Sequence, residues 1–258
     1  MRKAWITLAS LWTWLILGLC VLVWLPILAF LRVVTAPFDH GRYIAGRFFR
    51  QIVRVTVTAN PLWRFRCSGP IPANPRRPYV VVSNHESFTD ILLISLLPWE
   101  MKWMSKVELF RIPVMGWDMW LAGDIPLRRG EARSAIGALG RSKEVLADRV
   151  SVMIFPEGTR SKTGDMLPFK DGAFRLAIEA GVPILPLAVA GTGTALRKHD
   201  WRFGRANAEV RVLDPVETEG LTLDDVVALR TRVRGVIEQA RNQMRAAHTA
   251  AGEDVTEN

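Results

Sequence analysis

The chain opens with an apolar segment that is unlike the rest of the sequence. No charged residue occurs between Ala4 and Leu31, and about 20 apolar residues are enough for a helix that spans a bilayer. Pro26 lies inside the segment and predicts a kinked or broken helix, which forms either one span or a shallow helical hairpin. Four tryptophans are expected to act as anchors at the membrane interface, namely Trp5, Trp12, Trp14 and Trp24. The segment is therefore predicted to lie in a membrane.

After residue 60, short apolar runs alternate with stretches of helical periodicity. Strands are expected at 62–67, 80–82, 124–127, 151–155, 183–190 and 208–213, and helices at 88–97, 131–148, 172–180 and 223–247. We therefore predict the α/β class: a single domain with a central mixed or largely parallel sheet flanked by helices, preceded by an N-terminal membrane-anchoring helix or helical hairpin. Pro183 and Pro186 are expected to confine their strand to an edge of the sheet, or to fall at its ends.

Positive charge distinguishes the segment that follows the apolar one. The chain has 34 Lys and Arg against 25 Asp and Glu, a formal net charge of +9. Nine arginines fall between residues 32 and 77 with Asp39 as the only acidic residue there, so the positive-inside rule places this side in the cytoplasm. Residues 41–57 have the composition of an amphipathic helix on anionic lipid headgroups, and a linker helix packed on the domain is the alternative. We predict a membrane anchor with this helix at 1–58, a folded domain at 59–250 and a polar tail at 251–258.

Polar residues follow the apolar strand at 80–82 without a gap. A turn at His85, with Asp90 in the first turn of the next helix, brings the carboxylate within reach of the imidazole ring. In that geometry Asp90 fixes the tautomer and stabilises the imidazolium, while the other ring nitrogen accepts a proton from a hydroxyl. A structural role for a lone His/Asp pair is the alternative at this point.

The chain offers no protein nucleophile to accompany such a base. It has no Gly-x-Ser-x-Gly motif, Cys20 lies in the apolar segment and Cys67 lies in an expected strand. The expected nucleophile is therefore an alcohol of the substrate. A metal site is not expected, because a His-Glu-x-x-His motif would need a second histidine where Thr89 stands.

Two further polar segments follow expected strands or lie close to them, where ligands gather in α/β sheets. In one of them Lys106 is joined by Arg128 and Arg129, which suit phosphate but are equally typical of a solvated surface. The other is Phe-Pro-Glu-Gly-Thr-Arg-Ser at 155–161. There Gly158 permits close backbone approach and the planar guanidinium of Arg160 suits a phosphate group, with a bare turn as the alternative.

Four motifs stand in order along the chain and together carry a resemblance. They are Asn-His-x-Ser-x-x-Asp at 84–90, Lys-x-Glu-Leu-x-x-x-Pro-x-x-Gly at 106–116, Phe-Pro-Glu-Gly-Thr-Arg-Ser at 155–161 and Val-Pro-Ile-x-Pro at 182–186. Over about residues 60–215 the chain resembles the glycerolipid acyltransferases, most closely the bacterial type of 1-acyl-sn-glycerol-3-phosphate acyltransferase. The resemblance implies acyl transfer from acyl-CoA or acyl carrier protein to the free hydroxyl of lysophosphatidic acid, which gives phosphatidic acid.

The resemblance also implies roles for particular residues. His85 would be the base and Asp90 its orienting partner. The phosphate of the acceptor would be held by Lys106, Arg128 and Arg160, in a site shaped by Glu157, Gly158 and Thr159. No metal or cofactor is implied beyond the thioester co-substrate, and the catalytic domain would face the cytoplasm from the cytoplasmic membrane, in contact with anionic lipids. One departure is that the family often has two lysines before a Gly-Ala pair, where this chain has Lys170 and Asp171.

Several alternatives fit the sequence. One alternative acceptor is a lyso-ornithine lipid or another lysophospholipid. Water as the acceptor would make the chain a lipid hydrolase, and a non-catalytic membrane lipid-binding protein is the alternative that needs no acceptor. Nucleic acid is a poor partner, because the arginines cluster beside the membrane segment. The apolar stretch 99–121 either borders the acyl groove or is ordinary core.

Overall fold

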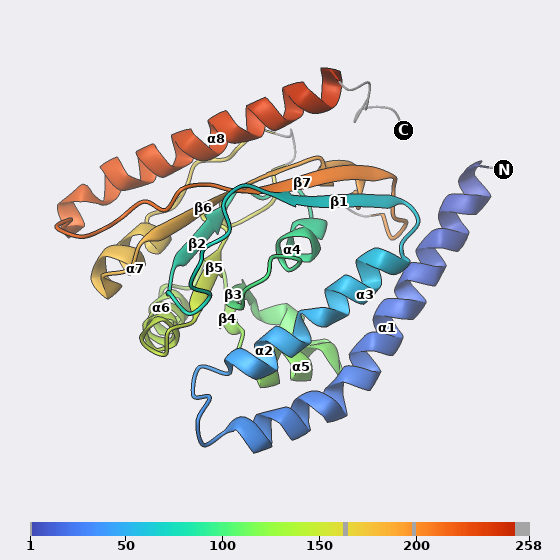
Figure 1. Ribbon diagram of the computed structural model, residues 1–258, viewed down its shortest axis with the longest axis horizontal. Coiled ribbons are helices and arrows are strands. Elements are labelled where there is room, and N and C mark those ends of the chain that lie inside the picture. Colours follow the sequence, from blue (N-terminus) through green and yellow to red (C-terminus); the bar gives the residue numbers. More distant parts are fainter. Residues whose placement is uncertain (1, 162–164, 198–199, 251–258) are drawn as a thin grey trace.

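A seven-stranded sheet forms the centre of the molecule, with helices on both faces (Figure 1). The structure is a computed structural model and describes residues 2–161, 165–197 and 200–250. Within these residues the strands are β1 (Trp63–Ser68), β2 (Val80–Ser83), β3 (Met101–Lys106), β4 (Ile125–Leu127), β5 (Ser151–Ile154), β6 (Ile184–Ala190) and β7 (Ala206–Val212). The helices are α1 (Arg2–Thr35), α2 (Tyr43–Phe49), α3 (Gln51–Ala59), α4 (Thr89–Ile94), α5 (Met115–Ala122), α6 (Ala132–Ala147), α7 (Gly172–Ala180) and α8 (Val226–Ala250), with 3-10 helices η1 (Val107–Arg111), η2 (Thr192–Thr194) and η3 (Leu223–Asp225).

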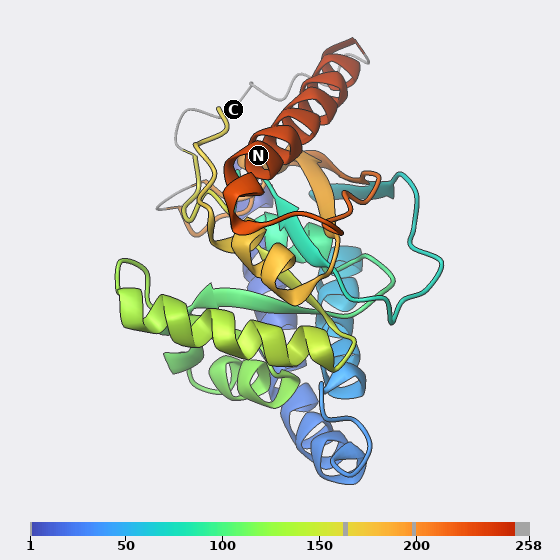
Figure 2. The same cartoon turned by 90° about the vertical axis from the view of Figure 1, so that its left-hand side faces the viewer.

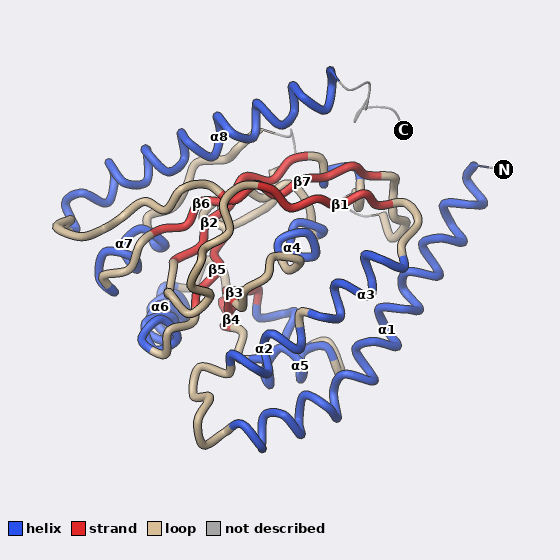
Figure 3. The backbone as a smooth tube through the Cα atoms, viewed as in Figure 1, coloured by secondary structure: helices blue, strands red, loops and turns tan. Residues whose placement is uncertain are grey.

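The sheet is mixed and mostly parallel, which confirms the predicted fold class. The strand order is β1-β7-β6-β2-β5-β3-β4, and the β6–β7 pair is antiparallel whereas the other pairs are parallel. Figure 3 shows the strands running between the two helical layers. Alternate residues of β2 serve the two layers: Val80 and Val82 pack with α6, α7 and α8, whereas Val81 packs with α4. In the side view of Figure 2, α8 lies at the top of the molecule and the C-terminal end of α1 reaches the bottom.

The proline-containing strand β6 is central, so the expectation of an edge position is wrong. β6 lies between β7 and β2, and Pro186 falls inside it. The carbonyl of Pro186 accepts a hydrogen bond from the N–H of Leu213, just beyond the end of β7. The nitrogen of Pro186 therefore faces Leu213, beyond the end of β7, so its missing N–H falls outside the β6–β7 ladder, which begins at Leu187 and Val212.

Helix α1 continues through Pro26 as one helix, so neither a break nor a hairpin forms within this segment. It is long and apolar enough to cross a membrane, by length and composition. Its buried hydrophobic residues run from Ala9 to Leu28, about 28 Å along the helix axis, and this face packs on α3 and α5. Because that length approaches the thickness of a bilayer core, inserting α1 across a membrane would carry the helices packed on it into the bilayer too.

The tryptophans of α1 use their polar edges inside the protein. The indole N–H groups of Trp12, Trp14 and Trp24 donate to the carbonyls of Ala59, Trp201 and Phe48 at 3.1, 2.9 and 3.1 Å. Their polar edges are therefore satisfied within the protein, although Trp12 and Trp14 stay partly exposed, and their place at a membrane interface stays a prediction. The outward face of α1 is nevertheless apolar, with exposed side chains that include Leu8, Leu11, Leu15, Leu19, Leu22 and Phe30.

The arginine-rich segment at 41–57 forms two helices, α2 and α3, that are packed on the domain. Arg50, at their junction, is buried and bonds both carboxylate oxygens of Asp124 through its two terminal nitrogens. Glu100 and Lys102 complete this buried charge cluster, with 2.9 Å between the Lys102 ammonium and the Glu100 carboxylate. Arg50 therefore does not face lipid headgroups, and the alternative of a packed linker applies to it. The boundary predicted at residue 59 stays a prediction, and the tail at 251–258 lies outside the described residues.

Asp118 of α5 is fully buried, and neither of its carboxylate oxygens has a hydrogen-bond partner among the described residues. Burial raises the pKa of Asp118 from 3.8 to about 7. The unfolded chain therefore releases this proton at lower pH than the folded protein, and stability falls as the pH rises from about 4 to about 7. We expect Asp118→Asn to raise the free energy of unfolding by about 2–4 kcal/mol at pH 8 and by clearly less at pH 5. Denaturant titrations at the two pH values measure this, and an equal gain at both would contradict it.

Candidate active site

The turn after β2 is fixed to the neighbouring strand before the histidine is reached. The side-chain amide of Asn84 donates to the carbonyl of Val189 at 2.9 Å, and its oxygen accepts the N–H of the same residue at 2.8 Å. This pair of bonds continues the parallel ladder of β2 and β6 by one side chain. His85 therefore begins its turn from a rigid position at the carboxyl end of the sheet, where ligands of α/β folds bind.

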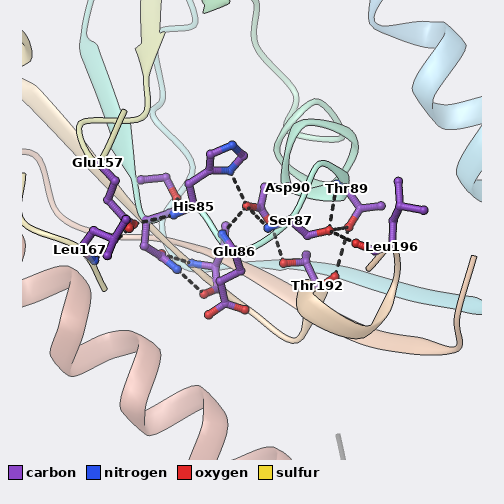
Figure 4. Close-up of polar contacts among 12 residues, drawn as sticks. His85, Glu86, Ser87, Thr89, Asp90, Glu157, Leu167, Thr192 and Leu196 are labelled. Atoms are coloured by element: carbon purple, nitrogen blue, oxygen red, sulfur yellow. Dashed lines mark hydrogen bonds and ion pairs between the residues drawn. The ribbon is translucent and has the colours of Figure 1, made fainter. Parts of the chain in front are cut away.

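Asp90 holds the imidazole ring of His85, as expected from the sequence. The His85 Nδ1 and an Asp90 carboxylate oxygen lie 2.8 Å apart (Figure 4). The same oxygen accepts the N–H groups of Glu86 and Ser87 at 2.7 and 2.9 Å, and the other oxygen accepts the hydroxyl of Thr192. Asp90 is fully buried, and these four donors stabilise its negative charge there. The carboxylate thus shapes the turn as well as orienting the ring.

The second ring nitrogen of His85, Nε2, can act as a base. With Asp90 at Nδ1, the neutral ring carries its proton on that atom, and Nε2 is then a proton acceptor. Phe155 stacks on the ring with 3.9 Å between centroids and 12° between planes, which limits rotation of the ring. His85 lines a cavity of about 160 Å³ that is also bordered by Phe88, Ile91, Trp103, Ser105, Lys106, Leu109, Arg129 and Arg160. A base in this position meets whatever hydroxyl enters that cavity.

The segment at 155–161 holds the backbone of His85. One carboxylate oxygen of Glu157 accepts the His85 N–H at 2.8 Å and the other accepts the Leu167 N–H at 2.9 Å, while the Ser161 N–H donates to the His85 carbonyl at 3.1 Å. Burial raises the pKa of Glu157, although the two N–H groups favour its charged form. Glu157 therefore contacts the histidine turn directly, a role that sequence reasoning did not assign to it.

The neighbours of Glu157 differ in their relation to the site. Gly158 has a φ of +71°, and a Cβ there would lie 2.9 Å from the Lys170 ammonium nitrogen. Glycine suits both the left-handed backbone and the close approach. Thr159 is exposed on the surface of the turn.

Three cations line the histidine cavity, and one of them, Arg129, suits phosphate by its sequence but received no role from the resemblance. Lys106, Arg129 and Arg160 border it. Arg128 instead lines an adjoining cavity of about 460 Å³ and pairs with Glu131 at 3.2 Å. Burial lowers the pKa of Arg129, and the charge of Arg160 lowers it further, so two guanidinium groups lie close enough to repel. Such a pair favours an anion between them.

A signal for Arg129 was present in the sequence. Side chains at alternate positions of a strand lie on the same face of the sheet. Continuing β4 (Ile125–Leu127), Arg129 is expected on the face of Ile125 and Leu127, whereas Arg128 is expected on the face of Pro126. Asp171, which stands where the resemblance implies a second lysine, pairs with Arg230 of α8 at 2.5 Å. Asp171, which replaces the lysine of the family, therefore serves to attach the start of α7 to α8.

An apolar cavity of about 510 Å³ opens on the other side of the histidine cavity, between α1 and the domain. The two cavities share Phe88, Ile91, Trp103, Ser105 and Leu109. Of the apolar stretch 99–121, Trp103 and Met115 line this space, whereas Trp99 is core and Trp117 is exposed. His85 thus lies between an apolar cavity and a cationic one.

Comparison with known proteins places this geometry in a family. The family model described as Acyltransferase matches residues 64–190. Those residues form an acyltransferase-family domain. The match runs from β1 to the end of β6, so the acyltransferase domain contains the dyad and the three cations of its cavity, whereas Thr192 and α8 lie beyond it.

Relatives of the acyltransferase domain carry a more specific name. The 1-acyl-sn-glycerol-3-phosphate acyltransferase alpha of Homo sapiens is 45% identical over 162 residues, which cover 62% of this chain and 57% of the human protein. The 1-acyl-sn-glycerol-3-phosphate acyltransferase of Saccharomyces cerevisiae is 37% identical over 163 residues, 62% of this chain and 54% of that protein. The chain thus spans little more than half the length of these curated relatives.

A solved structure matches nearly the whole chain. The crystal structure of the 1-acyl-sn-glycerophosphate (LPA) acyltransferase PlsC from Thermotoga maritima aligns with a TM-score of 0.79 and 26% sequence identity. The alignment covers 95% of this chain and 98% of that one. The likeness therefore extends beyond the acyltransferase domain to elements on either side of it.

Proposed function

We propose that the chain transfers a fatty acyl group from a thioester donor, acyl-CoA or acyl carrier protein, to the free hydroxyl of lysophosphatidic acid, and so forms phosphatidic acid. One observation carries the proposal: the free ring nitrogen of His85 lies where an apolar cavity meets a cavity bordered by cations. A lysophospholipid matches this arrangement, because its acyl chain suits the apolar cavity, its phosphate suits the cations, and its free hydroxyl lies between the two. The names of the relatives support the same substrate.

In the proposed reaction His85 acts as base and then as acid. Its Nε2 takes the proton of the glycerol hydroxyl while the hydroxyl oxygen attacks the thioester carbonyl carbon, giving a tetrahedral intermediate. The intermediate then breaks its carbon–sulfur bond, and the imidazolium returns the proton to the departing thiolate. Asp90 stabilises the imidazolium between the two steps. The step involves no acyl-enzyme, no metal and no cofactor other than the donor.

Substrate binding follows from the cationic histidine cavity and from the apolar cavity beside α1. We assign the phosphate to Lys106, Arg129 and Arg160, because guanidinium and ammonium groups form charge-assisted hydrogen bonds to phosphate oxygens. Arg128 lines the outer part of the same cationic region. The cavity beside α1 takes an acyl chain, since its walls are mostly apolar side chains.

The reaction is proposed to take place at a membrane that contains anionic lipids. The apolar outer face of α1 would contact the lipid, and the apolar cavity opens beside that helix. The distribution of arginines predicts the cytoplasmic side of the cytoplasmic membrane.

A single-turnover assay of the detergent-purified protein tests the function. Labelled lysophosphatidic acid is supplied with acyl-CoA or with acyl carrier protein, first in detergent micelles and then in vesicles of phosphatidylcholine and phosphatidylglycerol. Labelled phosphatidic acid is expected with at least one donor, and the protein is expected to float with the vesicles. If a lyso-ornithine lipid or another lysophospholipid is acylated instead, the proposed acceptor is wrong. Release of free fatty acid would indicate a hydrolase. No product with any acceptor would refute the proposal.

A further inference from the structure

Glu86 is a buried carboxylate beside the dyad that the proposed reaction does not use. Its side chain accepts hydrogen bonds from the guanidinium groups of Arg241 at 2.8 Å and Arg245 at 3.0 Å, both on α8. Its backbone N–H donates to the Asp90 carboxylate at 2.7 Å. In Figure 4 the Glu86 side chain points away from the His85 ring. Glu86 therefore connects the dyad to a helix that begins 140 residues later in the chain (226 − 86).

The environment of Glu86 makes this connection a strong one. Burial raises the pKa of Glu86 and the charge of Asp90 raises it further, whereas the two arginines lower it. Arg241 is itself only 4% exposed. Removing one partner of a buried ion pair leaves an uncompensated charge, which costs far more than the intact pair stabilises. The arginines of α8 thus add a buried ion-pair contact to the other hydrogen bonds that hold the His85 turn.

The same helix also holds the segment that precedes α7. Arg230 pairs with Asp171, and Arg234 donates to the carbonyl of Met166 at 3.3 Å. Met166 is next to Leu167, whose N–H is held by Glu157. Helix α8 therefore attaches to both parts of the site, the dyad turn and the loop bound by Glu157, although it lies outside the matched residues 64–190.

We propose that Glu86 is a positioning residue and that its ion pairs with Arg241 and Arg245 make α8 part of the apparatus that aligns the His85–Asp90 dyad. The proposal rests on the proposed function for its kinetic consequence. Neither arginine contacts the cavities, so the pairs act on the rate through the geometry of the turn and leave substrate binding in place.

Four variants test the role: Glu86→Gln, Arg241→Gln, Arg245→Gln and the double variant Glu86→Gln/Arg241→Gln. We expect Glu86→Gln and Arg241→Gln each to lower kcat about tenfold while KM for lysophosphatidic acid changes less than about twofold. Loss of the exposed partner in Arg245→Gln is expected to lower kcat about threefold. The double variant should be no slower than the slower single variant, because the pair acts as a unit. The control is Glu179→Gln, which removes the surface ion pair between α7 and Lys143 of α6.

Hydrogen exchange gives a second readout that needs no activity. The N–H groups of Glu86 and Ser87 bond the Asp90 carboxylate, so peptides covering 84–91 should exchange about tenfold faster in Glu86→Gln and Arg241→Gln, but not in Glu179→Gln. Unchanged exchange and a kcat within twofold of the parent would overturn the positioning role. An inactive parent would overturn the proposed function alone, because the exchange comparison still decides the role of Glu86. If Glu86→Gln does not fold, Arg245→Gln, which removes a 42%-exposed side chain, decides by the same two measures.

Discussion

Replacing His85 by alanine is expected to lower kcat for phosphatidic acid formation by at least about 10³-fold. The structure provides one ring nitrogen at the meeting point of the cavities, and the described residues that line the histidine cavity include no second histidine or carboxylate to replace it. General-base catalysis typically contributes about 10²–10⁴-fold, and His85 is proposed to serve both as base and as acid. The loss therefore falls at the upper part of that range. Rates are compared in single turnover at saturating donor and acceptor.

Two further variants interpret the result. His40→Ala removes an exposed histidine far from the dyad in sequence and should leave kcat unchanged. Asp90→Asn is expected to lower kcat about 10²–10⁴-fold, because the amide no longer stabilises the imidazolium. A His85→Ala variant that keeps more than a tenth of the parental kcat, in folded form, would show that another group takes the proton.

Replacing Arg129 or Arg160 by glutamine is expected to raise KM for lysophosphatidic acid about 10–100-fold. Hydrogen bonds to charged groups contribute about 1.5–3 kcal/mol each, and both guanidinium groups border the histidine cavity. Because the acyl cavity and the base are untouched, kcat should fall much less than KM rises. Steady-state kinetics with lysophosphatidic acid at fixed donor measures both constants.

The choice between neighbouring arginines makes this prediction specific. Arg128→Gln should raise KM clearly less than Arg129→Gln, since Arg128 lies in the adjoining cavity and is paired with Glu131. Arg133→Gln, on the exposed start of α6, is the control for loss of one positive charge. Monoacylglycerol lacks the phosphate, so the KM for this acceptor should differ little between the parent and Arg129→Gln. Equal effects at Arg128 and Arg129 would refute the assignment.

The local parts of this site were predictable from the sequence, because they depend on residues close together in the chain. His85 and Asp90 are five positions apart, and a turn followed by a helix is enough to join them. The apolar runs of β2, β5 and β6 likewise follow from hydrophobicity alone. Strand β3 was missed because the stretch 99–121 is apolar without alternation, and Lys102 is of a residue type that is seldom buried.

What the sequence could not reveal depends on distant partners. Arg50 reads as a surface arginine until Asp124, 74 positions later, is beside it. Pro186 is acceptable in a central strand only because its neighbour β7 ends there. Glu86 reads as a solvated residue of a motif until α8 is in place. In each case the deciding quantity is a tertiary contact, which overrides what the residue type favours on its own.

The long separations within the site also set an order of events during synthesis. Thr192, which donates to Asp90, follows it by 102 residues, and Arg241 follows Glu86 by 155. A chain still growing on the ribosome already displays the apolar α1 and the residues of the dyad, but it lacks the groups that hold the dyad in shape. The dyad residues are therefore synthesised well before the residues that hold them, and the contacts from Arg241 and Arg245 can form only after α8 has been made.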